Sequence, residues 1–147
     1  MANPEVVDYL FERFDTLLNE NDIDYVKWDM NRSISDWYSP SVPADRQKEI
    51  PHRYVLGVYV LLDRLTKAHP GVLFEGCAGG GGRFDAGMLF YQPQIWTSDN
   101  TDAHDRTLIQ YGTSFFYPVS AMSAHVSAVP NHQTGRITSL STRGIVA

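Results

Sequence analysis

Cysteine is nearly absent from the sequence: Cys77 is the one cysteine among 147 residues, so no disulfide can form within the chain. This scarcity favours a reducing compartment, and we expect the protein to be cytoplasmic. No apolar run approaches the roughly 18 residues of a membrane-spanning helix. The opening residues, MANPEVVDY, carry acids where a signal peptide has basic residues, so we expect no secretory leader.

The sequence also lacks a surplus of positive charge. Its formal net charge is −5 at pH 7, and its lysines and arginines are scattered along the chain. Both features argue against nucleic acid or an anionic membrane as a partner. Neither G-x-x-x-x-G-K-[ST] nor G-x-G-x-x-G, the usual phosphate-binding motifs, has a match. The content of 43% apolar and 12% aromatic residues indicates a globular domain.

Helix and strand patterns alternate along the chain. Asn3 and Pro4 are typical of a helix start, with a capping side chain followed by proline at the first helical position. Helices are predicted from Asn3 to about Asn21, from Pro51 to Pro70, briefly within 83–90, over 102–116 and from Thr138. Strands are predicted at 24–28, 72–75, 94–98 and 122–126. In the helix over 102–116 we expect an inward face formed by Leu108, Ile109, Phe115 and Phe116.

Strands that alternate with helices, without hairpin signals between them, predict an α/β fold with a parallel sheet. The strand at 24–28 is short and does not alternate in polarity, as in strands that are buried on both faces. The sequence begins at a helix cap with no strand before it and ends in STRGIVA, so we expect it to be part of a larger α/β fold. About four βα units would form half of a (β/α)8 TIM barrel, whose usual length is about 250 residues.

Carboxylates recur at the ends of three consecutive predicted strands. They are Asp29, Glu75 and the pair Asp99 and Asp102. In parallel α/β folds the working residues lie at the C-terminal ends of the strands, so we expect these side chains to face one cavity. They could be the carboxyl pair of a glycoside hydrolase, ligands of a hard metal, or helix caps.

Each carboxylate also has a structural interpretation. Asp102 directly precedes a predicted helix, so a capping role fits it best. Asp29 could form an ion pair with Lys27 or Arg32. A metal site is disfavoured, because only His104 and His125 lie near the candidate positions and their spacing is not that of ligands.

The neighbours of these carboxylates include two tryptophans and a glycine run. Trp28 adjoins Asp29, and Trp96 lies three residues before Asp99. Indole faces can pack on pyranose rings or simply fill a core. The run GCAGGGG would allow close backbone approach or left-handed turns. Cys77 could be a nucleophile with His125 as its base, but a small side chain that lines a pocket is the favoured interpretation.

Three of these stretches, YVKWDMNR, LFEGCAGGGGRFDAGML and QIWTSDNTDA, together resemble glycoside hydrolase family 36, the bacterial type of α-galactosidase. The segments PHRYVLGVY, IQYGTSFFYP and AHVSAVPNHQTGR fit the same family, so the resemblance covers nearly the whole chain. It implies that residues 1–147 are part of a (β/α)8 catalytic domain, roughly its fourth to seventh strands, with the flanking domains absent.

The resemblance also implies roles for individual residues. Asp29 in the KWD motif would be the nucleophile and Asp99 in the SDN motif the general acid/base of a retaining reaction. The substrate-binding residues that it implies are Lys27, Trp28, Met30, Asn31, Cys77 and Gly80, whereas Glu75 and Asp102 match positions without a catalytic role. The implied substrates are terminal α-galactosides such as melibiose and raffinose, cleaved without a cofactor or metal. The parent enzyme would be a homo-oligomer, and tetramers are common in the family.

Other readings share much of this chemistry. An α-N-acetylgalactosaminidase or a galactosyl-transferring enzyme would use the same two carboxylates. A non-catalytic sugar-binding fragment is a different class, and intact Asp29 and Asp99 argue against it. The chain is much shorter than family members, so the pocket is expected to be incomplete. A half barrel with two open sheet edges should be poorly folded and inactive by itself.

Overall fold

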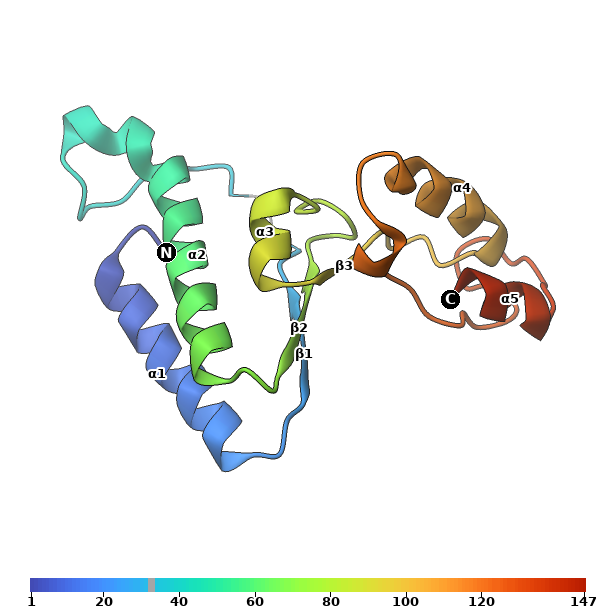
Figure 1. Cartoon of the computed structure of the whole chain (residues 1–147). Coiled ribbons are helices and arrows are strands. Elements are labelled where there is room, and N and C mark those ends of the chain that lie inside the picture. The colour runs from blue at the N-terminus through green and yellow to red at the C-terminus, as the bar shows by residue number, and fades with distance from the viewer. Residues whose placement is uncertain (32–33) are drawn as a thin grey trace. The chain divides into compact units, whose positions relative to one another are not determined.

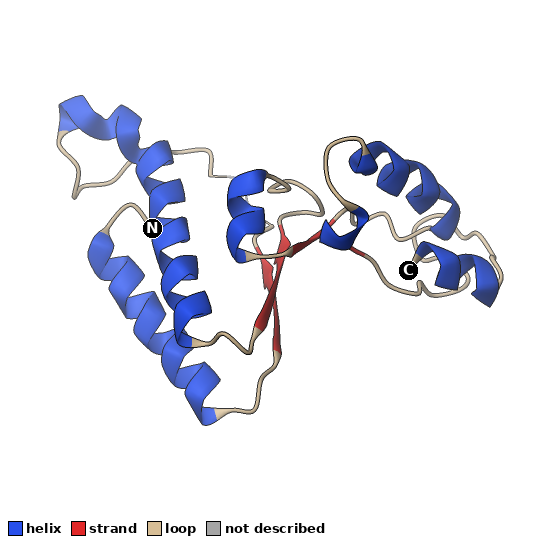
Figure 2. Cartoon of the chain, viewed as in Figure 1, coloured by secondary structure: helices blue, strands red, loops and turns tan. Residues whose placement is uncertain are grey.

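The computed structural model describes residues 1–31 and 34–147 (Figure 1). Four strands form one sheet in the order β1-β2-β3-β4, and both β2–β3 and β3–β4 pair in parallel. The strands are β1 (Tyr25–Asp29), β2 (Leu73–Cys77), β3 (Gln94–Trp96) and β4 (Met122–Ser123). Helices stand between successive strands along the chain (Figure 2). The predicted α/β fold with a parallel sheet is confirmed.

The chain divides into two compact units, one of Met1–Val26 with Ser33–Leu73 and the other of Lys27–Arg32 with Phe74–Ala147. The helices of the first unit are α1 (Pro4–Glu20), the 3-10 helix η1 (Ala44–Glu49) and α2 (Ile50–Ala68). Those of the second unit are α3 (Ala86–Tyr91), α4 (Ala103–Ser114), the 3-10 helix η2 (Val119–Ala121) and α5 (Leu140–Val146). None of the helices within the described ranges is both long and apolar enough to cross a membrane.

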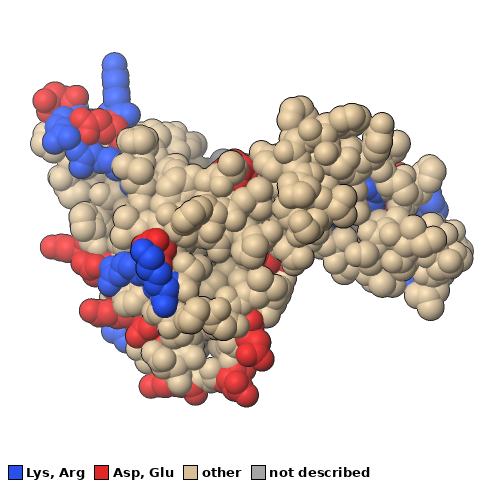
Figure 3. Space-filling model, in the orientation of Figure 1, with Lys and Arg blue, Asp and Glu red and all other residues tan. Residues whose placement is uncertain are grey.

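The first unit is a helix pair, and the sequence predicted where it begins. The Asn3 side chain accepts a hydrogen bond from the Glu5 N–H at 3.1 Å, and Pro4 occupies the first turn. Helices α1 and α2 pack side by side (Figure 1), and their buried side chains include Val7 from α1 and Leu62 from α2. Acidic and basic side chains are interspersed over this unit on the face that Figure 3 shows.

The second unit contains the strand ends on which the predicted site depends. Its sheet core is formed by Phe74, Ile95 and Trp96, which are 2%, 1% and 6% exposed. The register places Gly76 opposite Ile95 and Ile95 opposite Met122, so the last residues of β2, β3 and β4 reach the same edge of the sheet. Parallel strands present their carboxyl ends together at such an edge.

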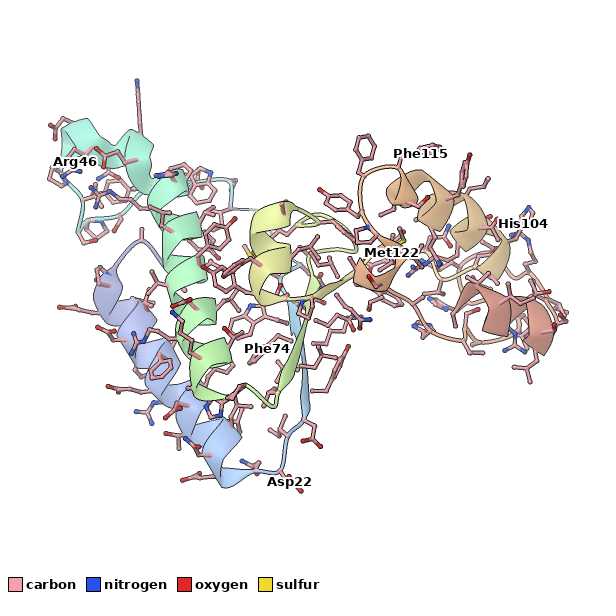
Figure 4. The ribbon with its side chains drawn as sticks, in the orientation of Figure 1. Asp22, Arg46, Phe74, His104, Phe115 and Met122 are labelled. Atoms are coloured by element: carbon pink, nitrogen blue, oxygen red, sulfur yellow. The ribbon has the colours of Figure 1, made fainter. Side chains whose placement is uncertain are left out.

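Two expectations from the sequence were wrong. Strand β1 is not buried on both faces: it is an edge strand of this sheet, and its residues alternate between exposed and half-buried. In α4 three of the four residues predicted to face inward are turned to solvent, with Leu108 71%, Phe115 67% and Phe116 84% exposed, and only Ile109 is half-buried. Figure 4 shows Phe115 at the end of α4. Periodicity identified an apolar face there, but it carries no information on which surface covers that face.

Candidate active site

Asp29 is the last residue of β1, and donors surround its carboxylate. The Asn31 amide donates to Oδ2 of Asp29 at 2.8 Å. The Cys77 thiol and the Met30 N–H also form hydrogen bonds with this carboxylate, and the Lys27 ammonium contributes a nearby positive charge. Lys27 and Asp29 are two residues apart on a strand, so their side chains lie on the same face. The end of β1 therefore gathers groups that stabilise the charge of one carboxylate.

The electrostatic balance at Asp29 favours the charged form. Partial burial by itself raises the pKa of Asp29, but the hydrogen bonds from Cys77, Asn31 and Met30, together with the charge of Lys27, hold the pKa below its ordinary value. A carboxylate with a lowered pKa is ionised at neutral pH, as a nucleophile must be.

The glycine run joins the end of β1 to the loop that follows β3. Asn31 Oδ1 accepts a hydrogen bond from the Gly79 N–H at 2.9 Å, so the amide that holds Asp29 also holds this loop. Gly80 has φ +81° and packs so closely on the next loop that an added Cβ would lie 2.9 Å from the Asp99 nitrogen. Gly79 and Gly80 thus connect the surroundings of Asp29 with the backbone of Asp99.

Asp99 has a sparser environment than Asp29. Its side chain is exposed, and Oδ1 accepts a hydrogen bond from the Trp96 indole at 3.2 Å. The backbone on either side of Asp99 is held by a buried guanidinium, because Arg106 donates to the Ser98 carbonyl at 2.6 Å and to the Asn100 carbonyl at 2.8 Å. Arg106 is 3% exposed.

The Trp96 ring is enclosed by protein side chains. Lys27 Nζ lies 3.9 Å from its centroid, the Arg106 guanidinium carbon 4.4 Å, and the His125 ring stacks on it at 4.9 Å. The Trp96 residue is 6% exposed, so little of it is accessible to a sugar. Of the two interpretations of Trp96, packing is the one that the structure supports.

The two remaining carboxylates have structural roles. Glu75 is 5% exposed and forms an ion pair with Lys27 at 3.5 Å. Asp102 caps α4, accepting from the N–H groups of His104 at 2.9 Å and Asp105 at 3.0 Å. Asp102 also accepts from the Thr134 hydroxyl at 2.6 Å and pairs with Arg136. The capping interpretation of Asp102 is confirmed.

The nucleophile interpretation of Cys77 finds no support. Burial raises the pKa of the Cys77 thiol, a Gly80 N–H lowers it and the neighbouring Asp29 raises it, leaving the pKa above its ordinary value. The imidazole proposed as its base, His125, stacks on Trp96. Within residues 1–31 and 34–147, no three His, Cys, Asp or Glu side chains are placed to hold a metal ion.

Most residues predicted for the site lie in one unit and are linked by contacts. Lys27, Asp29, Asn31 and Cys77 form a single network, and Gly80 adjoins Asp99. Trp28 and Met30 have different settings. Trp28 alternates to the strand face opposite Lys27 and Asp29. The Met30 N–H, which also lies against the Asp29 carboxylate, donates to the Cys77 carbonyl at 3.1 Å. Arg32, suggested as an ion-pair partner of Asp29, lies outside the described residues.

Sequence reasoning missed Arg106, which organises the Asp99 loop. A signal was present, since Arg106 lies three residues before Ile109, on the helix face that was predicted to point inward. A charged residue on such a face requires partners, and Arg106 finds them in backbone carbonyls. The hydrogen bond from the Gly79 N–H to Asn31 was also missed, because that contact joins residues 48 positions apart.

Comparison with known proteins identifies the family of the chain. The Melibiase family profile matches residues 1–147. Alpha-galactosidase 1 of Pediococcus pentosaceus is 64% identical over 147 residues, which is 100% of this chain and 20% of that protein. The α-galactosidase of Lactobacillus brevis is 61% identical with a TM-score of 0.96, covering 99% of this chain and 20% of that structure.

The AgaA enzyme of Geobacillus stearothermophilus has also been solved with sugars. Its complexes with raffinose and with stachyose each match at 57% identity and a TM-score of 0.96, covering 99% of this chain and 20% of the AgaA chain. The chain thus spans about one fifth of the length of the relatives that it matches. These matches confirm the fold as part of a (β/α)8 barrel of glycoside hydrolase family 36.

Proposed function

Because the chain belongs to the melibiase family of glycoside hydrolase family 36, we propose that it supplies both catalytic carboxylates of a retaining α-galactosidase. The observation that supports this best is the pair of strand ends joined by the glycine run. One carries Asp29, whose carboxylate is contacted by several donors, and the other carries Asp99, whose carboxylate accepts from the Trp96 indole. Under this proposal residues 1–147 belong to a (β/α)8 catalytic domain.

Asp29 is the nucleophile in this proposal. Its ionised carboxylate attacks the anomeric carbon, the glycosidic bond breaks, and a covalent galactosyl-enzyme forms. The lowered pKa of Asp29 supports the role, because the attacking oxygen carries a negative charge at neutral pH. Lys27, Asn31 and Cys77 stabilise that charge in the free enzyme and are close enough to meet the sugar.

Asp99 is the general acid and then the general base. It gives a proton to the departing oxygen, and in the second step it takes a proton from the water that releases galactose. We expect the Asp29 and Asp99 carboxyl groups to lie roughly 5–5.5 Å apart in the working enzyme, as the retaining mechanism requires. Double displacement between two carboxylates requires no cofactor or metal.

The sugar complexes of AgaA lend support to this pair. The stachyose complex was obtained with a variant in which one aspartate is replaced by alanine, and the raffinose complex with one in which another aspartate is replaced by asparagine. Those two aspartates are separated by the same number of positions as Asp29 and Asp99, 99 − 29 = 70. Raffinose and stachyose, bound by AgaA, are accordingly the class of substrate that we propose here.

The proposal extends to location, assembly and the activity of the chain alone. The single cysteine supports a cytoplasmic location. The resemblance to the family supports a homo-oligomeric parent enzyme, such as a tetramer. The chain alone is proposed to be inactive, because it spans about one fifth of its relatives and cannot provide the whole pocket.

The proposal can be tested by exchanging this chain for the matching fifth of AgaA. We expect the chimera to hydrolyse melibiose and raffinose with retention of configuration, observed by NMR of the first-formed galactose. Asp29→Ala and Asp99→Ala should each remove this turnover. The isolated chain, assayed in parallel, should show none. A chimera that binds galactose in calorimetry but never turns over would identify a binding module instead.

Added azide separates the two carboxylate roles. In Asp29→Ala the azide replaces the nucleophile and attacks once, so the product is the β-galactosyl azide. In Asp99→Ala the azide attacks the covalent intermediate, so the product is the α-galactosyl azide. Exchanged products would reverse our assignment, and full activity in Asp29→Ala would remove it altogether. Release of N-acetylgalactosamine from its α-glycosides by the unsubstituted chimera would instead redefine the substrate.

A further inference from the structure

The contact between Trp96 and Asp99 constrains where a proton can sit. An indole N–H donates and never accepts, so the oxygen that it contacts must act as an acceptor. That oxygen is Oδ1 of Asp99, 3.2 Å from Nε1 of Trp96. The carbonyl oxygen of a carboxylic acid accepts more strongly than its hydroxyl oxygen, so this contact favours the proton of Asp99 on Oδ2. The side chain is exposed, which leaves Oδ2 open to a ligand.

Both partners of this hydrogen bond are held in place. Trp96 is fixed by the side chains around its ring, where Lys27 Nζ lies at 3.9 Å and the Arg106 guanidinium carbon at 4.4 Å from the centroid. The backbone of Asp99 is fixed because Arg106 also donates to the carbonyls of Ser98 and Asn100. A single buried guanidinium thus positions the donor and the loop that carries the acceptor.

We propose that Trp96 is a positioning residue that assigns the catalytic proton to Oδ2 of Asp99. This inference rests on the proposed function, in which Asp99 is the acid/base. In the first step the glycosidic C–O bond breaks, the bond from Asp29 to the anomeric carbon forms, and the Oδ2 proton passes to the departing oxygen. In the second step water attacks the same carbon, its proton passes to Oδ2, and the bond to Asp29 breaks.

The indole also favours the forward proton transfer. Once the proton has left, Asp99 is an anion, and the Trp96 N–H then donates to a charged acceptor. Hydrogen bonds to charged groups are roughly twice as strong as those between neutral groups. The contact therefore stabilises the deprotonated state of Asp99. Its contribution to the rate should be larger for a leaving group that needs a proton in order to depart.

The dependence on the leaving group supplies the test, made in the AgaA chimera. Trp96→Phe keeps an aromatic ring and removes the N–H. We expect kcat/KM for melibiose to fall about 10- to 100-fold, the size of losing one hydrogen bond to a charged group. For 2,4-dinitrophenyl α-galactoside we expect a fall below about 3-fold, because dinitrophenolate departs without a proton. An equal fall for both substrates would overturn the inference.

Three controls keep the outcomes distinct. Trp37→Phe removes an indole from the first unit and should change neither substrate. In Asp99→Ala, kcat/KM should fall more on melibiose than on the dinitrophenyl galactoside, and an equal fall on both substrates would remove the proposed function itself. If Asp99→Ala behaves as expected but Trp96→Phe lowers kcat/KM equally on both substrates, only this inference is removed. If Trp96→Phe does not fold, the sulfur isostere β-(3-benzothienyl)alanine at position 96 keeps the ring shape without the N–H and should give the same selective fall.

Discussion

The two carboxylates of the site are both exposed, but they differ in the groups that contact them. Asp29 receives the Asn31 amide, the Cys77 thiol and the Met30 N–H, with the Lys27 charge nearby. Asp99 accepts a hydrogen bond from the Trp96 indole. Around Asp29 the protein holds the carboxylate itself, and around Asp99 it holds the backbone, through Arg106.

This difference separates the two chemical roles. A nucleophile must stay ionised, and several donors aimed at its oxygens keep the proton away. An acid/base must exchange a proton in every turnover, so one of its oxygens has to remain open. Two aspartates at the ends of β1 and β3 therefore gain different functions from the groups that contact them.

The largest expected effect comes from replacing the anion itself. Asp29→Asn keeps the shape of the side chain and cannot form the covalent intermediate, so we expect kcat of the chimera on melibiose to fall by roughly 10⁴-fold or more. Single-turnover mass spectrometry should show no galactosyl adduct on the peptide that contains position 29. An adduct there would mean that deamidation or contamination restored the aspartate, which peptide mapping would reveal.

A smaller effect should follow from moving Asp99 without changing it. Gly80→Ala would place a Cβ 2.9 Å from the Asp99 nitrogen, so the loop must shift and kcat should fall about 10²-fold, as a displacement of about 1 Å can produce. Gly79→Ala is the matched control. Gly79 also has a positive φ, +56°, but a Cβ added there meets nothing within 4 Å. If both variants lose activity equally, backbone strain and not the approach to Asp99 is responsible.

The donors of Asp29 should be visible in the pH profile. The Cys77 thiol lowers the pKa of Asp29, so Cys77→Ala should raise that pKa and move the acid limb of kcat/KM to higher pH. Cys77→Ser keeps a donor and should move the limb less. The measurement is kcat/KM on an aryl α-galactoside from pH 3 to 8 in the chimera. An acid limb unchanged by Cys77→Ala would show that the thiol does not bond Asp29.

The smallest effect on chemistry should come from the cap of α4. Asp102→Ala removes acceptors from two backbone N–H groups and leaves Arg136 without this partner, and we expect a loss of about 1–3 kcal/mol with a lower melting temperature of the chimera. Burial raises the pKa of Asp102, but Thr134, two N–H groups and Arg136 hold it below its ordinary value.

That balance fixes the sign of the pH dependence. The stabilisation by Asp102 is present above the ordinary carboxyl pKa and is lost as pH falls through the lowered pKa of the folded state. The melting temperatures of Asp102→Ala and the unsubstituted chimera should therefore converge in acid. A difference that stays constant down to low pH would contradict an ionised Asp102 in the folded protein.

Local signals in the sequence were sufficient for the order of elements. The cap at Asn3 and Pro4 and the breaks between apolar runs are properties of neighbouring residues, and the structure follows them. Strand ends were less accurate: the strand predicted over 122–126 is only Met122–Ser123. Hydrogen-bonded pairing decides where such a strand stops, and its partner lies elsewhere in the chain.

The site was predictable in its members and not in its contacts. The rule of strand ends found Asp29 and Asp99, and a helix start set Asp102 aside, but only the family resemblance chose the pair over Glu75. The enclosure of Trp96 could not be foreseen, because Lys27 and His125 approach the ring from distant parts of the sequence. Contacts of this kind arise from the fold and leave no local pattern.

The shared contacts of Lys27 have a consequence for redesign of this site. One ammonium pairs with Glu75, lies over Trp96 and acts on the charge of Asp29. A substitution near Asp29 that moves Lys27 will therefore also change the surroundings of Trp96, and the reverse holds as well. Libraries aimed at new glycosidic linkages should vary the KWD and WTSD segments together, because gains found one segment at a time need not combine.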